Sequence, residues 1–139
     1  MKKVFALMGL MSVLVLGLTE VSYAEGNWSD TKFKFNFGDW QPYSGWKTEK
    51  RVKRDYTSSY MSCKSSNGRS YTAEVMGAKS KTDEWAYDVG SPAYRFSEGY
   101  TYYMTNYVKE KKYTYATIMA TPNSSGHFAA TGYWSPDSI

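Results

Sequence analysis

The chain has one cysteine and one histidine in 139 residues, and this scarcity excludes several kinds of site. Cys63 alone allows no intramolecular disulfide. His127 alone allows no multi-histidine metal site, and a Ser-His-carboxylate triad would have to use that residue. No G-x-S-x-G motif surrounds any serine. The sequence therefore predicts no catalytic residue, no metal site, no disulfide and no cofactor.

Leucine is confined to one apolar run, Val4 to Leu18, which follows two lysines. Ser22-Tyr23-Ala24 then forms a small-x-small cleavage site. The run is shorter than the roughly 20 residues of a membrane-spanning helix, so we expect no transmembrane segment after cleavage. We predict that residues 1–24 are a signal peptide and that 25–139 form a single secreted domain, extracellular or associated with the cell surface. Export without disulfides indicates a Gram-positive bacterial protein.

Aromatic residues take the place of leucine. The chain has five Trp, 14 Tyr and six Phe, and all but Phe5 and Tyr23 follow the predicted signal. Such side chains favour strands, and each buries about 150–250 Å², so a core is feasible without leucine. Tyr and Trp also need partners for their polar atoms, so many of them should lie half-buried. Composition therefore predicts an aromatic-rich surface as the main functional feature.

The clearest strand is Thr31 to Phe37, which alternates strictly between Phe and polar residues. A turn-rich loop follows it, short strands are expected at 83–89 and 94–96, and a last strand at 127–134. No apolar pattern of helical period lasts beyond the signal. We expect an all-β fold, either an antiparallel β-sandwich or a partly open barrel, with six to eight short strands.

Two hairpins are predicted. The first turns at Asn67-Gly68, where both residues can take the positive φ of a type I′ turn. Counting outward from this turn pairs Lys64 with Tyr71 and places Ser62, Ala73, Tyr60 and Val75 on the same face. The second hairpin is expected over 98–121, with its turn near Glu110-Lys111.

The Ser66-Asn67-Gly68-Arg69 turn and the terminal Gly132-Tyr133-Trp134-Ser135-Pro136-Asp137-Ser138 segment accompany a short signal and a leucine-poor, aromatic-rich domain. This layout resembles the small exported β-sandwich proteins of Gram-positive bacteria, among them the lactococcin-like bacteriocins and uncharacterised relatives. The resemblance implies export and action on the envelope of a neighbouring cell. It assigns no functional residue.

The segment 47–54 holds five basic residues in eight and lies close in sequence to three aromatic residues. Aromatic rings beside cations can hold sugars or polymer phosphates, and a charged strand edge that resists aggregation is the alternative explanation. The candidate binding residues are Trp40, Tyr43, Trp46, Lys50, Arg51, Lys53 and Arg54. A formal net charge of +4, which falls to +3 without the predicted signal, suits a bacterial cell-wall polymer or an anionic membrane surface and does not indicate specific binding of nucleic acid.

Three functions remain open on the sequence. The first is a small secreted, non-enzymatic protein that acts on or binds the bacterial cell envelope in the manner of a bacteriocin. The second is a carbohydrate- or wall-polymer-binding module. The third is an exported hydrolase that uses a carboxylate pair from Asp83, Glu84 and Asp88, although a solvated loop rim is the favoured explanation of that acidic cluster.

Overall fold

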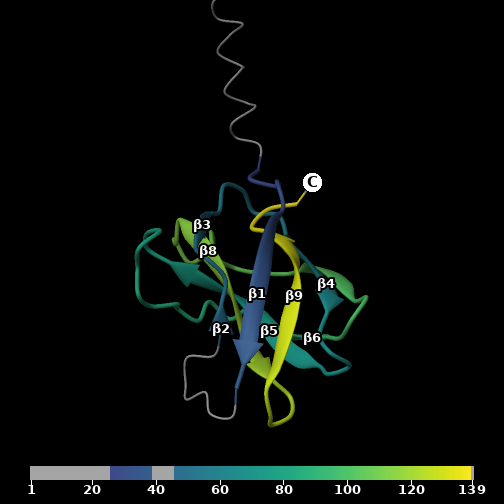
Figure 1. Ribbon diagram of the computed structural model, residues 1–139. Coiled ribbons are helices and arrows are strands. Elements are labelled where there is room, and N and C mark those ends of the chain that lie inside the picture. Colours follow the sequence, from purple (N-terminus) through teal and green to yellow (C-terminus); the bar gives the residue numbers. More distant parts are fainter. Residues whose placement is uncertain (1–25, 39–45, 139) are drawn as a thin grey trace, which may run out of the picture.

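The computed structural model describes residues 26–38 and 46–138, and these residues form nine strands and no helix (Figure 1). The strands are β1 (Thr31–Phe37), β2 (Trp46–Lys47), β3 (Arg51–Val52), β4 (Ser59–Ser65), β5 (Tyr71–Ala78), β6 (Tyr94–Phe96), β7 (Thr101–Met104), β8 (Tyr115–Pro122) and β9 (Phe128–Ser135). The first sheet has the order β1-β9-β4-β7. The second has the order β2-β8-β5-β6, and β3 also pairs with β8. All pairs are antiparallel, which confirms the predicted all-β fold as a sandwich of two open sheets.

Aromatic rings fill the space between the sheets. Phe33, Phe35 and Phe37 of β1 are all buried, as the alternation predicts, and the residues between them are exposed. Phe35 meets Tyr71 of the opposite sheet edge to face, with ring centroids 5.8 Å apart, and Tyr71 stacks on Phe96 at 5.4 Å. These contacts replace the missing leucines, because each ring supplies a large apolar area and a defined geometry.

The first predicted hairpin has the right turn and the wrong strand pairing. Asn67 and Gly68 have φ values of 58° and 73°, and Arg69 N donates to the Ser66 carbonyl at 3.0 Å, so the chain reverses as predicted. However, β4 pairs with β7 and β9 in the first sheet, whereas β5 pairs with β6 and β8 in the second.

Burial explains why these two strands separate. The predicted register would place Lys64 on the same face as Tyr71, which is fully buried. With the strands in different sheets, Met61 and Cys63 of β4 point into the core from one side, and Tyr71 and the residues that alternate with it point in from the other. Each strand then keeps its polar side chains on an outer face, as sandwich packing requires.

The second predicted hairpin is wrong in the same way. A turn does lie at 107–112, where Lys111 N donates to the Tyr107 carbonyl at 3.0 Å and Lys112 has a φ of 70°. The strands on either side, β7 and β8, belong to different sheets. The only sequence neighbours that pair within the described chain are β5 and β6, so turns in this fold mostly carry the chain from one sheet to the other.

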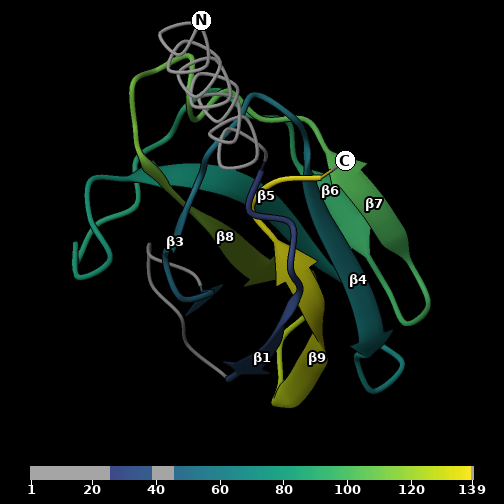
Figure 2. The ribbon, with the colours of Figure 1, turned by 90° about the horizontal axis from the view of Figure 1, so that it is seen from above.

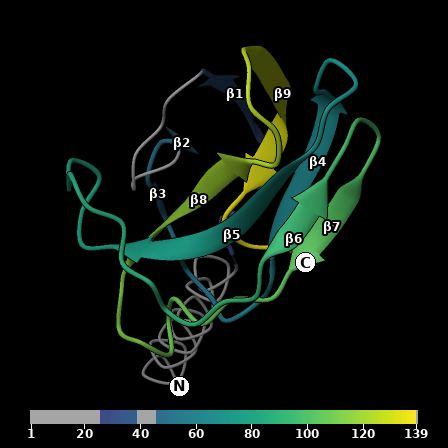
Figure 3. The same ribbon diagram turned by 90° about the horizontal axis from the view of Figure 1, so that it is seen from below.

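The remaining predictions are mixed. The strands expected at 94–96 and 127–134 are present as β6 and β9. Residues 83–89 form a loop whose one ladder contact is a bridge between Gly77 and Tyr87, so no strand lies there. The predicted loop between β1 and β2 falls largely on residues 39–45, outside the described residues. Seen from above and below, β6 and β7 run side by side at one edge of the molecule although they belong to different sheets (Figures 2 and 3).

The turn at Gly68 yields a testable prediction about stability. A Cβ atom added there meets nothing within 4 Å, so the cost of a side chain comes from the positive φ alone. Gly68→Val should lower the free energy of unfolding by at least about 1–2 kcal/mol, because a β-branched residue is disfavoured in this region. Urea denaturation measures the change, with Ser65→Val, at an exposed strand position nearby, as the control. An unaltered midpoint for Gly68→Val would contradict the turn assignment.

Candidate functional site

Lys53, one of the predicted binding residues, lies inside the protein. Its side chain is 0% exposed, and its Nζ is 2.5 Å from Asp137 Oδ1 and 2.6 Å from the Thr57 carbonyl. The other carboxylate oxygen of Asp137 accepts hydrogen bonds from Asn27 N at 2.6 Å and Arg54 N at 2.9 Å. This buried ion pair ties the C-terminal segment to the first described residues, so Lys53 has a structural role and is closed to a surface ligand.

A second carboxylate, Asp55, completes this cluster. Its Oδ1 lies 3.7 Å from Lys53 Nζ. Burial alone would raise the pKa of Asp55, but hydrogen bonds from the Thr57 hydroxyl and backbone N, together with Asp137 and the positive charge of Lys53, lower it below its usual range. Both acids of the cluster are therefore held by contacts within the fold.

Arg51 is also committed to the fold. Its guanidinium donates to Asn27 Oδ1 at 3.1 Å, to the Ser29 carbonyl at 2.8 Å and to the Trp134 carbonyl at 3.1 Å. It also lies over the Trp134 ring, 5.5 Å from its centroid. Arg51 thus fixes the segment that leads into β1, and burial lowers its pKa without removing its charge.

The other predicted binding residues do not form one surface in the described chain. Trp46 is half-buried and packs against Phe37, with ring centroids 6.2 Å apart. Lys50 is half-buried and Arg54 is exposed. Trp40 and Tyr43 lie outside the described residues. Of the predicted binding residues that are described, Lys50 and Arg54 are therefore left to a ligand, and Trp46, Arg51 and Lys53 are held by contacts within the protein.

The outer face of the first sheet offers a more coherent candidate. Strand alternation turns Tyr133 of β9, Tyr60 of β4 and Tyr103 of β7 away from the core. Tyr60 lies directly opposite Tyr103 in the ladder, with ring centroids 5.5 Å apart. Tyr133 lies opposite Lys32 of β1 and Ser62 of β4, one diagonal step from Tyr60. Three tyrosines thus stand on neighbouring strands of one face.

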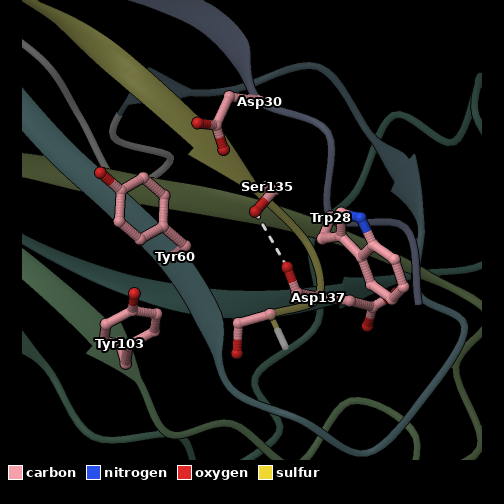
Figure 4. Close-up of a pocket in the computed structure, with 7 residues that line it drawn as sticks. Trp28, Asp30, Tyr60, Tyr103, Ser135 and Asp137 are labelled. Atoms are coloured by element: carbon pink, nitrogen blue, oxygen red, sulfur yellow. Dashed lines mark hydrogen bonds between the residues drawn. The ribbon is translucent and has the colours of Figure 1, made fainter. Parts of the chain in front are cut away.

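An aromatic pocket of about 290 Å³ opens at one end of this face (Figure 4). Trp28 stands on one side of it and Tyr60 and Tyr103 stand on the other, with Ser135 and Asp137 between them and Asp30 at the rim. Trp28 is 40% exposed and Tyr103 is 63% exposed. The Arg51 hydrogen bonds described above hold the chain on either side of Trp28, so the fold positions this ring.

A basic pocket of about 490 Å³ lies on the same face. Its floor is the backbone of Phe33 and Gly132, which pair across β1 and β9. The side chains around it come from three strands. They are Lys32 and Lys34 of β1, Thr131 and Tyr133 of β9, and Lys64 of β4.

Cys63 and two members of the acidic cluster are held by contacts within the fold. Cys63 is fully buried in β4, and burial raises the pKa of its thiol, so the reactive thiolate is disfavoured. Asp83 accepts hydrogen bonds from Lys79 N and Trp85 N, which lower its pKa, and Asp88 accepts from Gly90 N at 2.8 Å. These are bonds within the 79–90 loop. They support the interpretation of the acidic cluster as a loop structure.

Comparison with known proteins gives one family. Residues 20–138 match the family described as "Protein of unknown function (DUF2712)". The chain belongs to this family. No curated protein and no solved structure matches it. The DUF2712 family is not described as a bacteriocin family, so the likeness to lactococcin-like proteins stays a hypothesis.

In the described part of the chain, no helix is long and apolar enough to cross a membrane. Within 26–38 and 46–138, no group of three His, Cys, Asp or Glu side chains is placed to hold a metal ion.

Sequence reasoning missed the residues of the aromatic and basic pockets for a specific reason. Alternation did place Tyr60 and Lys64 on one face of their strand. It gave no indication that β4 lies between β9 and β7, because that pairing joins segments far apart in the chain. The feature of the sequence that could have indicated this face is the tyrosine that each of the strands β4, β7 and β9 carries on its outward side.

Proposed function

We propose that this chain is an exported, non-enzymatic protein that binds a glycan of the bacterial cell envelope through the aromatic pocket. The observation that carries the proposal is the placement of Trp28 across from Tyr60 and Tyr103 with polar groups between them. Export is supported by the lysine-led apolar run and the cleavage motif at Ser22-Tyr23-Ala24.

The pocket suits a sugar ring for physical reasons. Flat aromatic rings pack against the C–H face of a pyranose and remove apolar area from water. The Asp30 carboxylate accepts hydrogen bonds from hydroxyl groups, and the Tyr60 and Tyr103 hydroxyls both donate and accept. A pocket with apolar walls and a few convergent polar groups is typical of small-ligand sites.

The proposal is tested by binding to isolated cell-wall sacculi of Gram-positive bacteria, with the protein purified after expression of the full chain. Trp28→Ala and Tyr103→Ala should each reduce affinity at least tenfold, which corresponds to about 1.4 kcal/mol. Trp85→Ala and Tyr56→Ala are matched controls, because these rings are 67% and 66% exposed and lie outside the pocket. Equal affinities for all four variants and the parent protein would overturn the proposal.

The resemblance to lactococcin-like bacteriocins favours a second candidate, antagonism toward neighbouring cells. The same purified protein, spotted in a dose series on lawns of related Gram-positive bacteria, should then give inhibition zones that a heat-denatured sample does not give. Loss of these zones in Tyr103→Ala would connect killing to the aromatic pocket. If no zones form at any dose, the antagonistic function is overturned and the protein binds the envelope without toxicity.

A further inference from the structure

We infer that the basic pocket is an anion subsite, so that the glycan bound on this face is a polymer of sugars or polyols joined through phosphodiesters. This inference rests on the proposed glycan-binding function and specifies its ligand. Its basis is the convergence of Lys32, Lys34 and Lys64, from two strands that are not neighbours in the sheet, around one hollow.

A β-bulge helps to bring Lys64 into this group. In the ladder between β4 and β9, Cys63 pairs with Gly132 and Ser65 pairs with Thr131, so Lys64 is the extra residue on its strand. Lys64 and Ser65 are consequently both exposed on the outer side. Bulges re-aim side chains in this way, and here the bulge adds a lysine beside the hollow that Lys34 and Thr131 border.

Protection of one sheet edge does not explain why the three lysines meet at one hollow. Lys32 and Lys34 stand on β1, an edge strand, where charge discourages pairing with other molecules. Lys64 stands on the interior strand β4, past Ser62 where the pairing with β7 ends, so its charge does not protect the same edge as Lys32 and Lys34. Among the described residues no ion pair involves any of the three. Three like charges around one hollow repel one another, and a bound anion would relieve this repulsion.

The aromatic and basic pockets adjoin, so a single extended ligand reaches both. Tyr133 lines the basic pocket and Ser135 lines the aromatic pocket, and these residues lie two positions apart on β9. Two strand residues span about 6.6–6.8 Å. The Asp30 carboxylate at the rim of the aromatic pocket repels an anion there, so the charges of the ligand belong with the three lysines and its sugar rings with the aromatic side chains.

Phosphate is the anion that we assign to this subsite. All three charges are lysines, and a lysine ammonium binds phosphate oxygens as a compact point charge. No arginine, whose planar fork pairs with carboxylate and phosphate alike, lines the basic pocket. A phosphodiester polymer also supplies its charges at regular intervals along an otherwise neutral chain.

The test compares two triple variants of equal charge in binding assays with soluble probes. Lys32→Gln/Lys34→Gln/Lys64→Gln removes the subsite, and Lys81→Gln/Lys111→Gln/Lys112→Gln removes three exposed lysines elsewhere. The probes are glucosylated poly(glycerol phosphate), polygalacturonate and neutral dextran. The subsite variant should bind poly(glycerol phosphate) at least tenfold more weakly and with less dependence on salt, whereas the control variant should change less than threefold. Equal losses in the two variants, or none in the subsite variant, would overturn the inference.

The remaining outcomes separate the two proposals. Loss of poly(glycerol phosphate) binding with the lysine variant but not with Tyr103→Ala would support the anion subsite and overturn the glycan pocket. Loss with Tyr103→Ala alone would keep the glycan pocket and overturn the subsite. An equal lysine-dependent loss with polygalacturonate would overturn the preference for phosphodiesters. Equally tight, lysine-dependent binding to vesicles with anionic lipid would assign the face to a membrane surface instead.

Discussion

Replacing Asp137 with asparagine should lower the free energy of unfolding by about 3–5 kcal/mol, the largest effect that we expect from a single side chain. The substitution keeps the shape of the side chain and removes its charge. Lys53 would then keep a buried ammonium, 2.5 Å from a neutral amide, with only the partly exposed Asp55 left to balance it. The hydrogen bonds from Asn27 N and Arg54 N would also weaken, because they lose a charged acceptor.

Urea denaturation at neutral pH measures this effect. Asp83→Asn is the control, because that carboxylate is bonded only within an exposed loop and its replacement should leave the midpoint nearly unchanged. The double variant Lys53→Met/Asp137→Leu should recover much of the loss, since it removes both buried charges together. A loss below about 1 kcal/mol for Asp137→Asn would contradict the assigned role of the buried Lys53–Asp137 ion pair, which ties the C-terminal segment to the first described residues.

Gly132→Ala should lower the free energy of unfolding by about 3 kcal/mol or more. This value lies in the upper part of the range for overpacked cores. A Cβ atom at this position would lie 1.9 Å from the Ser62 carbonyl oxygen and 2.8 Å from the Phe33 ring. The first contact is with the backbone of β4, which β9 holds in register by its ladder. Relief therefore requires movement of two paired strands rather than rotation of one side chain.

The control for this variant is Gly38→Ala, where the nearest atom to the added Cβ is 3.5 Å away on His127. That change should stay within about 0.5 kcal/mol of the parent protein. Thermal and urea unfolding report both variants. A Gly132→Ala protein as stable as Gly38→Ala would show that β4 and β9 are farther apart than the structure places them.

The parts of the fold that sequence predicts are local. The face of each residue in β1 follows from strict alternation, and the positive φ at Asn67 and Gly68 follows from the needs of a tight turn. Strand pairing does not follow, because a turn specifies that the chain reverses and not whether its two arms share a sheet. β4 and β5 separate since only that arrangement buries Tyr71 while leaving Lys64 in water.

For the candidate site, too, the sequence predicts local features but not contacts between distant segments. The charge of Lys53 predicts a surface position, yet Asp137, 84 residues away along the chain, pairs with it inside the protein. The tyrosines at 60, 103 and 133 were predictable as members of strands. Their meeting on one face depends on the order β9-β4-β7, which no local pattern encodes.

The most direct test of the central claim is an NMR titration of the purified protein with soluble glucosylated poly(glycerol phosphate). We predict that amide shifts concentrate on the outer face of the first sheet, around Tyr60, Tyr103, Thr131 and Tyr133, and leave the 79–90 loop unchanged. Shifts confined to the 46–54 neighbourhood, or none at saturating polymer, would contradict the assignment of this face as the binding site.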